Sequence, residues 1–298
     1  MSLRRIGFVG VGRMGDAMAA RLLRRGFDVV AYDRDPLRLA GFVAQHGGSA
    51  ARSLAEAAAG ADALITMLPH GGVVREALLG PGGAAGVLAA DSIVIDMSST
   101  DPESTKATGA ELAQRGIRMV DAPVMGGVVF ARNASLDILA GGDPGDIDRC
   151  EELLSSLGRR IYRCGPLGSG HTLKAIANYI NAATLSAVLE GMTVGRKAGL
   201  DTALMAEALT ALCAGRQHPL EKKVIPQVLT RSYATGMTLD LIAKDLRIAV
   251  GLAAAHRAAA PIAACVASIW DDASEHFGAD VDQAEIVRYW EERGNVRL

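Results

Sequence analysis

The fold is decided by residues 5–15, which read RIGFVGVGRMG. An apolar run leads directly into three glycines with Gly-x-Gly-x-x-Gly spacing. In this motif the first glycine makes a tight turn, the second lets the backbone approach a pyrophosphate, and the third lets strand and helix pack closely. The helix N-terminus that follows favours negative charge. We therefore predict a strand, a turn and a helix, with these residues facing a dinucleotide: Gly10, Gly12, Arg13, Met14 and Gly15.

Outward from this motif, short apolar runs alternate with longer helical patterns as far as Cys164. Such alternation is typical of repeated strand-helix-strand units around a parallel sheet. Helix starts are marked by Asp35 before a proline and by Ser53 three residues before Glu56. The expected strands lie at 5–10, 28–33, 63–68, 92–97, 118–123, 136–141 and 160–164. The sequence predicts an α/β fold whose first domain, residues 1–164, is a doubly wound sheet of the Rossmann type.

The pattern changes at residues 165–170, where three glycines and a proline interrupt regular structure. The residues that follow have helical periodicity, so we expect an all-helical second domain over 165–298 that binds substrate and forms oligomers. The expected helices lie at 169–197, 201–214, 239–257, 261–277 and 282–292. The first of these is long, joins the two domains and is nearly free of charge, so it needs cover on most of its circumference. Burial in a subunit interface is the natural cover, and a homodimer or homotetramer is predicted.

Composition excludes several other classes of protein. The 298 residues carry 31 basic and 33 acidic side chains without a run of like charge, so no nucleic-acid partner is expected. No apolar stretch reaches the roughly 20 residues that span a bilayer, and the N-terminus lacks the continuous apolar core of a signal peptide. A cytoplasmic protein with no membrane partner is expected. The cysteines lie too far apart to suggest a zinc site or a redox dithiol: Cys150, Cys164, Cys213 and Cys265.

The choice of dinucleotide depends on Asp33, which ends the second expected strand eighteen residues after Gly15. A carboxylate at this place can accept hydrogen bonds from the ribose hydroxyls, and it would repel the additional phosphate of NADP. Arg34 has the opposite tendency, since an arginine could pair with that phosphate or stack on the adenine. NAD is therefore the expected cofactor, and NADP is left open.

A second candidate site lies on the long helix. Lys174, Asn178 and Asn181 are spaced at i, i+4 and i+7 and share one helix face. A lysine and two amides on an otherwise apolar helix are costly unless they are paired, and function is one reason to retain them. A lysine that reaches to solvent is the structural alternative. The glycine-rich residues 165–170 just before the helix favour a ligand site at the domain junction.

Four motifs, in order across essentially the whole chain, give a resemblance to a known family. They are GVGRMG at 10–15, DAPVMGG at 121–127, GSGHTLKAIAN at 168–178 and KDLRIA at 244–249. With them the chain resembles the β-hydroxyacid dehydrogenase family, which includes 3-hydroxyisobutyrate dehydrogenase and tartronate semialdehyde reductase. The resemblance implies that a hydride passes between a nicotinamide cofactor and a small 3-hydroxy acid, or the corresponding semialdehyde in reverse.

The resemblance also implies the roles of individual residues. Lys174 would be the general acid/base at the substrate hydroxyl. Asn178, the second catalytic residue, would form a hydrogen bond with the substrate. Burial on an apolar helix should lower the pKa of Lys174, so oxidation should accelerate as the pH rises. The backbone of Gly126 and Gly127 would bind the substrate carboxylate. Further residues expected at the cofactor are Leu68, Pro69, Ser99 and Lys244, with Asp245 supporting Lys244.

One position departs from the family. Met125 stands where the family usually has serine, so a hydroxyl that would help to hold the carboxylate is missing. Carboxylate binding should weaken, or the preferred substrate should present something larger or less polar. His171, one turn before Lys174, could contact such a substrate or tune the lysine, and an ordinary histidine on the helix surface is the alternative. Arg132 and Asn133 are candidates for an anionic substrate tail, and a solvated loop is the alternative for them.

Other functions stay open alongside this one. A decarboxylating sugar-phosphate dehydrogenase similar to 6-phosphogluconate dehydrogenase would share the glycine and lysine motifs, but such enzymes have a much longer helical region. Imine reductases share the architecture and generally lack the lysine. A catalytically silent NAD-binding sensor or scaffold would keep the glycines of residues 10–15 without any need of Lys174 and Asn178. The joint presence of the last two favours an enzyme.

Overall fold

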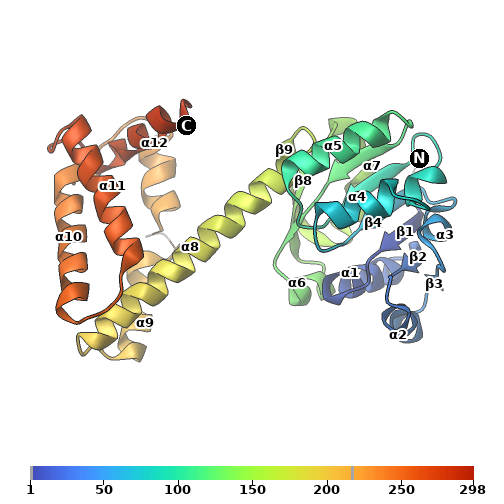
Figure 1. Cartoon of the computed structure of the whole chain (residues 1–298), viewed down its shortest axis with the longest axis horizontal. Coiled ribbons are helices and arrows are strands. Elements are labelled where there is room, and N and C mark those ends of the chain that lie inside the picture. Colours follow the sequence, from blue (N-terminus) through green and yellow to red (C-terminus); the bar gives the residue numbers. More distant parts are fainter. Residues whose placement is uncertain (1–2, 216–217) are drawn as a thin grey trace. The chain divides into compact units, whose positions relative to one another are not determined.

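The computed structural model describes residues 3–215 and 218–298 (Figure 1). Its internal contacts divide the chain into two units, Met1–Tyr179 and Ile180–Leu298. Each unit has hydrophobic clusters of its own. The long helix α8 (Ser169–Lys197) gives its first turns to the first unit and the rest to the second.

The first unit is built on a sheet that has nine strands in the described part of the chain. Six of them run parallel in the order β3-β2-β1-β4-β5-β6, and β8 then pairs antiparallel with β6 and β7 and parallel with β9. In this order β1 and β4 are neighbours at the place where the two mononucleotide-binding halves meet. The strands are β1 (Arg5–Val9), β2 (Asp28–Tyr32), β3 (Ser49–Ala50), β4 (Ala63–Thr66), β5 (Ile93–Asp96), β6 (Arg118–Asp121), β7 (Val124–Met125), β8 (Leu136–Gly141) and β9 (Gly158–Gly165).

All seven predicted strands are present, and two others are added. The additions, β3 and β7, have two residues each and are too short to show any alternation in the sequence. The antiparallel placement of β8 is a second difference, because only the pairing partner, and not the apolar run itself, sets the direction of a strand.

Helices cover both faces of this sheet, as the doubly wound prediction requires (Figure 1). In β5, Ile93 and Ile95 join the cluster under α1 and α7, whereas Val94 joins the cluster under α4 and α5, because successive strand residues point to opposite faces. The prediction of a Rossmann-type sheet is confirmed. The helices are α1 (Arg13–Arg24), α2 (Pro36–His46), α3 (Leu54–Ala58), α4 (Gly71–Leu79), α5 (Pro102–Ala113), α6 (Val128–Arg132) and α7 (Pro144–Ser155).

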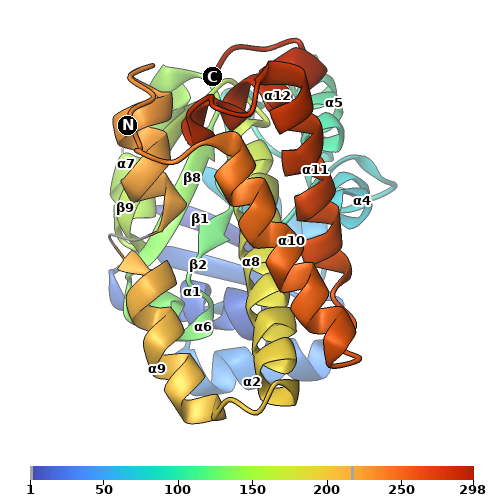
Figure 2. The ribbon, with the colours of Figure 1, turned by 90° about the vertical axis from the view of Figure 1, so that its left-hand side faces the viewer.

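The second unit is helical (Figure 2). α10 and α11 pack along each other in both ribbon views. The five predicted helices are present. α8 and α11 have the predicted bounds, and the last predicted helix consists of the 3-10 helix η4 and α12. The π-helix η3, which contains Pro226, was not predicted. The elements after α8 are α9 (Thr202–Cys213), η3 (Leu220–Val228), α10 (Leu239–Ala255), α11 (Pro261–Phe277), η4 (Gln283–Ile286) and α12 (Val287–Gly294).

Two further findings concern residues 3–215 and 218–298 only. None of their helices combines the length and the apolar character that crossing a bilayer requires. Their His, Cys, Asp and Glu side chains form no group of three that could hold a metal ion.

Candidate cofactor and catalytic site

The glycine turn after β1 has a different physical reason for each of its glycines. Gly10 has a φ of +97°, and a Cβ there would lie 2.4 Å from the carbonyl oxygen of Met67. A Cβ on Gly15 would lie 1.8 Å from the carbonyl oxygen of Gly10, so helix and turn touch closely. At Gly12, by contrast, a Cβ would meet nothing within 4 Å. The open space at Gly12 is therefore available to a ligand rather than filled by the protein.

Gly12 is also the N-cap of α1, and no side chain caps this helix. The first amides of a helix need acceptors, and its dipole adds a partial positive charge at this end. An uncapped N-terminus beside open backbone is suited to a phosphate group. The turn therefore fits the pyrophosphate of a dinucleotide.

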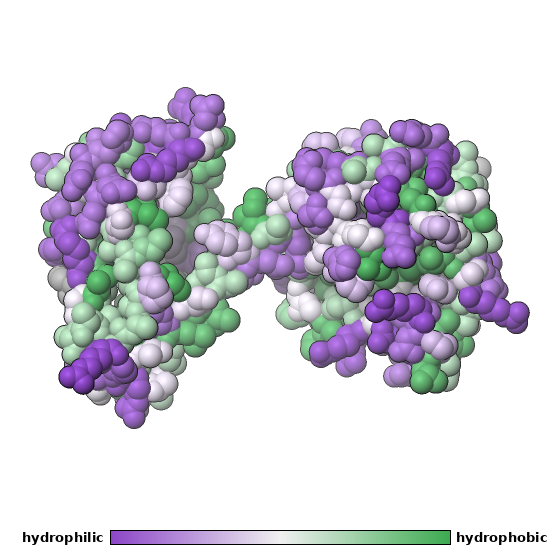
Figure 3. Space-filling model, in the orientation of Figure 1, coloured by the Kyte–Doolittle hydropathy of each residue, from purple (hydrophilic) through white to green (hydrophobic). Residues whose placement is uncertain are grey.

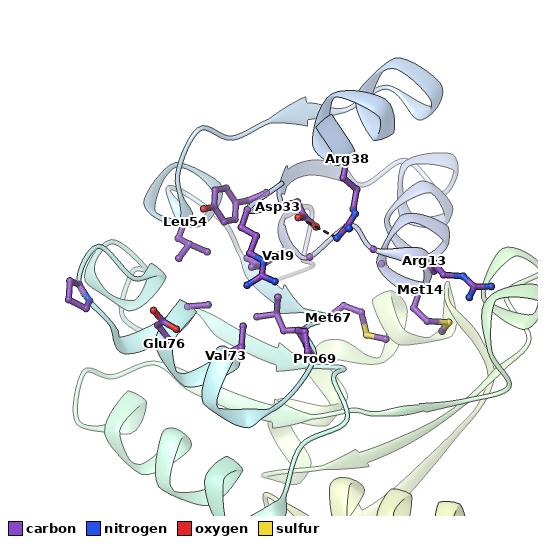
Figure 4. Close-up of a pocket in the computed structure, with 18 residues that line it drawn as sticks. Val9, Arg13, Met14, Asp33, Arg38, Leu54, Met67, Pro69, Val73 and Glu76 are labelled. Atoms are coloured by element: carbon purple, nitrogen blue, oxygen red, sulfur yellow. Dashed lines mark ion pairs between the residues drawn. The ribbon is translucent and has the colours of Figure 1, made fainter. Parts of the chain in front are cut away.

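A cavity of about 510 Å³ lies over this turn, wholly within the first unit (Figure 4). Of the residues predicted to face the cofactor, it is lined by Gly10, Gly12, Arg13, Met14, Gly15, Asp33, Arg34, Leu68 and Pro69. Lining residues that sequence reasoning missed include Tyr32, Arg38, Leu54, Val73 and Glu76. These come from α2, α3 and α4 or from the end of β2, and only the strand order brings them around one cavity.

Asp33 lies at the back of this cavity with its carboxylate already held. One carboxylate oxygen accepts from the Val11 N–H at 2.9 Å, and the other accepts from the Asp35 N–H at 2.9 Å. Arg38 approaches the same carboxylate at 3.7 Å (Figure 4). Because a carboxylate oxygen has more than one lone pair, Asp33 can still accept from a ribose hydroxyl. Arg38 adds a positive charge to that of Arg34 at this end of the cavity.

Ser99 differs from the other predicted cofactor residues. It is exposed in the loop after β5 and does not line the cavity. Its neighbour Ser98 is buried instead, and the hydroxyl of Ser98 accepts from the Leu68 N–H at 2.9 Å. The hydroxyl of Ser98, rather than that of Ser99, thus holds the backbone of the loop that carries Leu68 and Pro69.

The amine of Lys174 rests on the short strand β7. Its Nζ donates to the carbonyl oxygen of Val124 at 2.5 Å and lies 3.2 Å from the sulfur of Met125. The side chain is half-buried, and this desolvation lowers the pKa of Lys174 from its ordinary value. The structure therefore brings together Lys174 and the Met125–Gly127 segment, which the sequence placed in separate motifs.

Gly126 and Gly127 follow directly and provide accessible backbone. Both have positive φ values, 124° and 83°, which glycine adopts without strain. Both are exposed, and Gly127 is the N-cap of α6 without a side-chain cap. Exposed backbone amides at a helix start can bind a carboxylate. Asn178 is exposed one turn beyond Lys174 on the same helix face. Arg132 and Asn133 close α6, at its last residue and C-cap.

The structure corrects the prediction for His171. Its side chain is buried, with Nδ1 2.8 Å from the hydroxyl of Thr105 and Nε2 3.1 Å from the carbonyl oxygen of Ser98. Both ring nitrogens are therefore occupied inside the first unit, and neither is left to contact a substrate. The place of His171 one turn before Lys174 does not reveal this burial, because helix spacing does not show that the first turn of α8 lies against the sheet.

Lys244 and Asp245 belong to α10 in the second unit. Both are exposed and form an ion pair with each other at 3.0 Å. The expected place of Lys244 beside the nicotinamide stays a prediction.

Comparison with known proteins identifies the family of the chain. Residues 5–165 match the model for the NAD-binding domain of 6-phosphogluconate dehydrogenase, and residues 168–290 match that for the NAD-binding region of NADP-dependent 3-hydroxyisobutyrate dehydrogenase. The chain is 31% identical over 294 residues to the 2-(hydroxymethyl)glutarate dehydrogenase of Eubacterium barkeri, covering 99% of this chain and 97% of that protein. It is 32% identical over 283 residues to the 3-hydroxyisobutyrate dehydrogenase of Pseudomonas aeruginosa, covering 93% of both.

The solved structure of Mycobacterium tuberculosis 3-hydroxyisobutyrate dehydrogenase with L-serine has 28% sequence identity and a TM-score of 0.68, and the likeness covers 97% of this chain and 99% of that chain. The first family model assigns NAD binding to residues 5–165, which carry the glycine turn. The chain therefore belongs to the β-hydroxyacid dehydrogenase family.

Proposed function

We propose that this chain oxidises the alcohol of a small 3-hydroxy acid to the semialdehyde, or reduces the semialdehyde, with Lys174 as general acid/base. NAD or NADP, when bound, accepts or supplies the hydride. The observation that carries the proposal is the half-buried Lys174 amine on Val124, directly before the exposed backbone of Gly126 and Gly127. An acid/base and a carboxylate-binding backbone at this spacing are what a hydroxy acid requires.

In oxidation Lys174 takes the proton of the substrate hydroxyl, and in reduction it returns a proton to the same oxygen. Oxidation needs the neutral amine, and desolvation raises the fraction of the amine that is neutral at a given pH. The carbonyl of Val124 accepts a hydrogen from the amine and holds it in place. Asn178, one turn further along the helix, donates to the substrate.

The substrate class follows from what the relatives are named for. 2-(Hydroxymethyl)glutarate, 3-hydroxyisobutyrate and L-serine all contain a 3-hydroxypropanoate skeleton and differ in the group on the second carbon. The backbone of Gly126 and Gly127 binds the shared carboxylate, and Met125 lies beside it without a hydroxyl. We therefore place the substrate among 2-substituted 3-hydroxypropanoates whose substituent tolerates an apolar neighbour.

NAD is the preferred cofactor in this proposal, and NADP is accepted. The carboxylate of Asp33 faces the cavity and disfavours an additional phosphate. Arg34 and Arg38 line the same end of the cavity and reduce that penalty. Leu68 and Pro69 also line the cavity, and Lys244 is proposed to reach the nicotinamide from the second unit.

We further propose a homodimer or homotetramer of a protein located in the cytoplasm, in which residues 1–164 bind the cofactor and residues 165–298 bind substrate and form the subunit interface. Exposed apolar side chains support the interface, since they gather over the helical unit (Figure 3). On α8 alone they include Ile180, Leu185, Val188 and Leu189.

The test is a panel of 2-substituted 3-hydroxypropanoates and their semialdehydes, assayed with both cofactors by NADH or NADPH absorbance. We expect turnover within this panel and a lower KM for NAD. In Lys174→Ala, turnover should fall about 10²–10⁴-fold, the usual contribution of general acid/base catalysis, with the Kd for NADH unchanged. Full turnover in Lys174→Ala would remove the lysine from the reaction, and turnover of other substrate classes alone would refute the substrate assignment.

A further inference from the structure

The first unit contains a buried polar cluster that the proposed reaction does not use directly. Thr66, Asp96 and Asp121 are the last residues of the neighbouring strands β4, β5 and β6, and all three are fully buried. Buried carboxylates are costly unless hydrogen bonds satisfy them. Asp96 accepts from the Thr66 hydroxyl at 2.9 Å and from the Ser98 N–H at 3.1 Å. The partners of Asp121 lie outside the sheet.

Asp121 caps the helix that carries Lys174. One carboxylate oxygen accepts from the Gly168 N–H at 2.7 Å and the other from the His171 N–H at 2.7 Å. Burial raises the pKa of Asp121, and these two amides oppose the rise. A cap supplied by a strand, rather than by the residue before the helix, fixes where α8 starts and how it is rotated relative to the sheet.

The ring of His171 adds two further attachments. A carbonyl oxygen can only accept, so the Nε2 that lies 3.1 Å from the oxygen of Ser98 carries a hydrogen. Nδ1 lies 2.8 Å from the hydroxyl of Thr105, which also lies 3.1 Å from the carbonyl oxygen of Asp101. The first turn of α8 is thus tied to the loop after β5 and to α5.

These attachments bear on Lys174 because Lys174 follows His171 by one turn. Its amine reaches Val124, which in turn follows Asp121 by three residues. The same carboxylate therefore holds both the helix that provides the amine and the strand end that leads to its acceptor. Any shift of the helix start would move the amine along the Val124–Gly127 segment.

We propose that Asp121, His171 and Thr105 are positioning residues, which set the first turn of α8 so that the Lys174 amine lies on the Val124 carbonyl. The proposal rests on the proposed function of Lys174. A displacement of about 1 Å in a reacting group can cost on the order of 10²-fold in rate. When the attachments are removed, we therefore expect kcat to fall by a larger factor than the binding of substrate or cofactor weakens.

The variants that test it are Thr105→Val and Thr105→Ser. Valine keeps the shape and removes the hydroxyl that faces His171, whereas serine keeps the hydroxyl. In Thr105→Val we expect kcat to fall about tenfold or more while the KM for substrate and the Kd for NADH change less than about twofold, and Thr105→Ser should restore most of kcat. Equal activity in valine variant and wild type, or equal losses in both variants, would overturn the proposal.

A second readout does not depend on turnover. In the protein without cofactor, reductive methylation of Lys174, followed by mass spectrometry of the peptide, reports how firmly the amine is held. We expect faster labelling in Thr105→Val and His171→Gln than in the wild type and Thr105→Ser. Labelling at the wild-type rate in both altered proteins contradicts the proposal.

Asp143→Ala is the matched control, because Asp143 caps α7 through the Gly145 N–H at 2.9 Å and α7 does not carry Lys174. Asp143→Ala should lower the melting temperature and leave kcat and the labelling rate of Lys174 unchanged. If Asp143→Ala loses as much kcat as Thr105→Val, the loss in Thr105→Val is explained by general destabilisation and the positioning role fails. If Lys174→Ala keeps its turnover, the proposed function fails. If Lys174→Ala loses its turnover while Thr105→Val and His171→Gln keep the wild-type turnover, the positioning role fails and the proposed function stands.

Discussion

Gly12 and Gly15 lie three positions apart, and each is a glycine for a different physical reason. At Gly15 an added Cβ meets the backbone oxygen of Gly10 at 1.8 Å, whereas at Gly12 it meets no protein atom within 4 Å. Gly15 is required by the packing of the protein, and Gly12 leaves room for the approach of a ligand. A sequence motif treats the two alike, and the structure separates them.

Alanine substitutions should separate them experimentally. Gly15→Ala should lower the melting temperature and abolish NADH binding, because the added methyl group would force the backbone of the glycine turn to move away from it. Gly12→Ala should keep the wild-type melting temperature, since its φ of −66° suits alanine, but weaken NADH binding through its methyl group. Thermal unfolding and fluorescence titration with NADH measure both effects. Equal stability losses in the two variants would contradict this account.

The pH dependence of the reaction is also a property of one residue. Desolvation penalises the ammonium form of Lys174, so its pKa lies below the ordinary 10.5. Oxidation requires the neutral amine and should rise with pH with a midpoint below 10.5, whereas reduction requires the ammonium and should fall over the same range. Initial rates in both directions across this pH range test the sign. A profile that is flat in both directions would show that Lys174 does not exchange the proton.

At the scale of elements, α2 connects cofactor recognition to a helix cap. Asp35 caps this helix by accepting from the Leu37 N–H at 3.0 Å and the Arg38 N–H at 3.3 Å, and Arg38 then faces Asp33. The start of α2 therefore decides where Arg38 lies at the cavity. The predicted cap at Asp35 is confirmed, but its consequence for the cavity follows only from the fold.

Asp35→Ala should destabilise the protein by about 0.5–2 kcal/mol, the usual cost of losing an N-cap, and should raise the Kd for NADH. Asp201→Ala removes the same kind of cap from α9, where Asp201 accepts from the Leu204 N–H at 2.9 Å. This control should cost similar stability and leave the Kd unchanged. Calorimetry and NADH titration decide, and an equal change of Kd in both variants would speak against a role of α2 in cofactor binding.

At the scale of the whole molecule, the exposed apolar side chains of the helical unit need a partner. Leu185 and Leu189 lie one turn apart on α8 and are 59% and 55% exposed. Single exposed apolar residues are ordinary, but neighbouring ones on one helix face mark an interface. They are the residues through which we expect subunits to associate.

The double variant Leu185→Glu, Leu189→Glu should be a monomer by light scattering at concentrations where the wild type is a dimer or tetramer, because a buried unpaired carboxylate opposes association. Leu37→Glu, at an 83% exposed position of the first unit, should not change the mass. A wild type that is monomeric at all concentrations would refute the oligomer.

The amino-acid sequence by itself determined the seven longer strands, the approximate bounds of the helices after residue 168, the glycine turn and the pair of motifs around Met125 and Lys174. These features are encoded within a few neighbouring residues, through periodicity, caps and glycine spacing. For the same reason the two-residue strands, the antiparallel β8 and the π-helix were missed, since each depends on what a segment packs against.

Only the tertiary structure decided which distant residues meet. Asp121 accepts from the Gly168 N–H, 47 residues later, and the ring of His171 reaches Ser98 across 73 positions. Such contacts depend on which strands are neighbours in the sheet, a choice made by the sum of all packing and hydrogen-bond energies rather than by any local pattern. His171 was therefore listed among the substrate-binding residues from its place on the helix, although the folded chain buries its ring between Thr105 and Ser98.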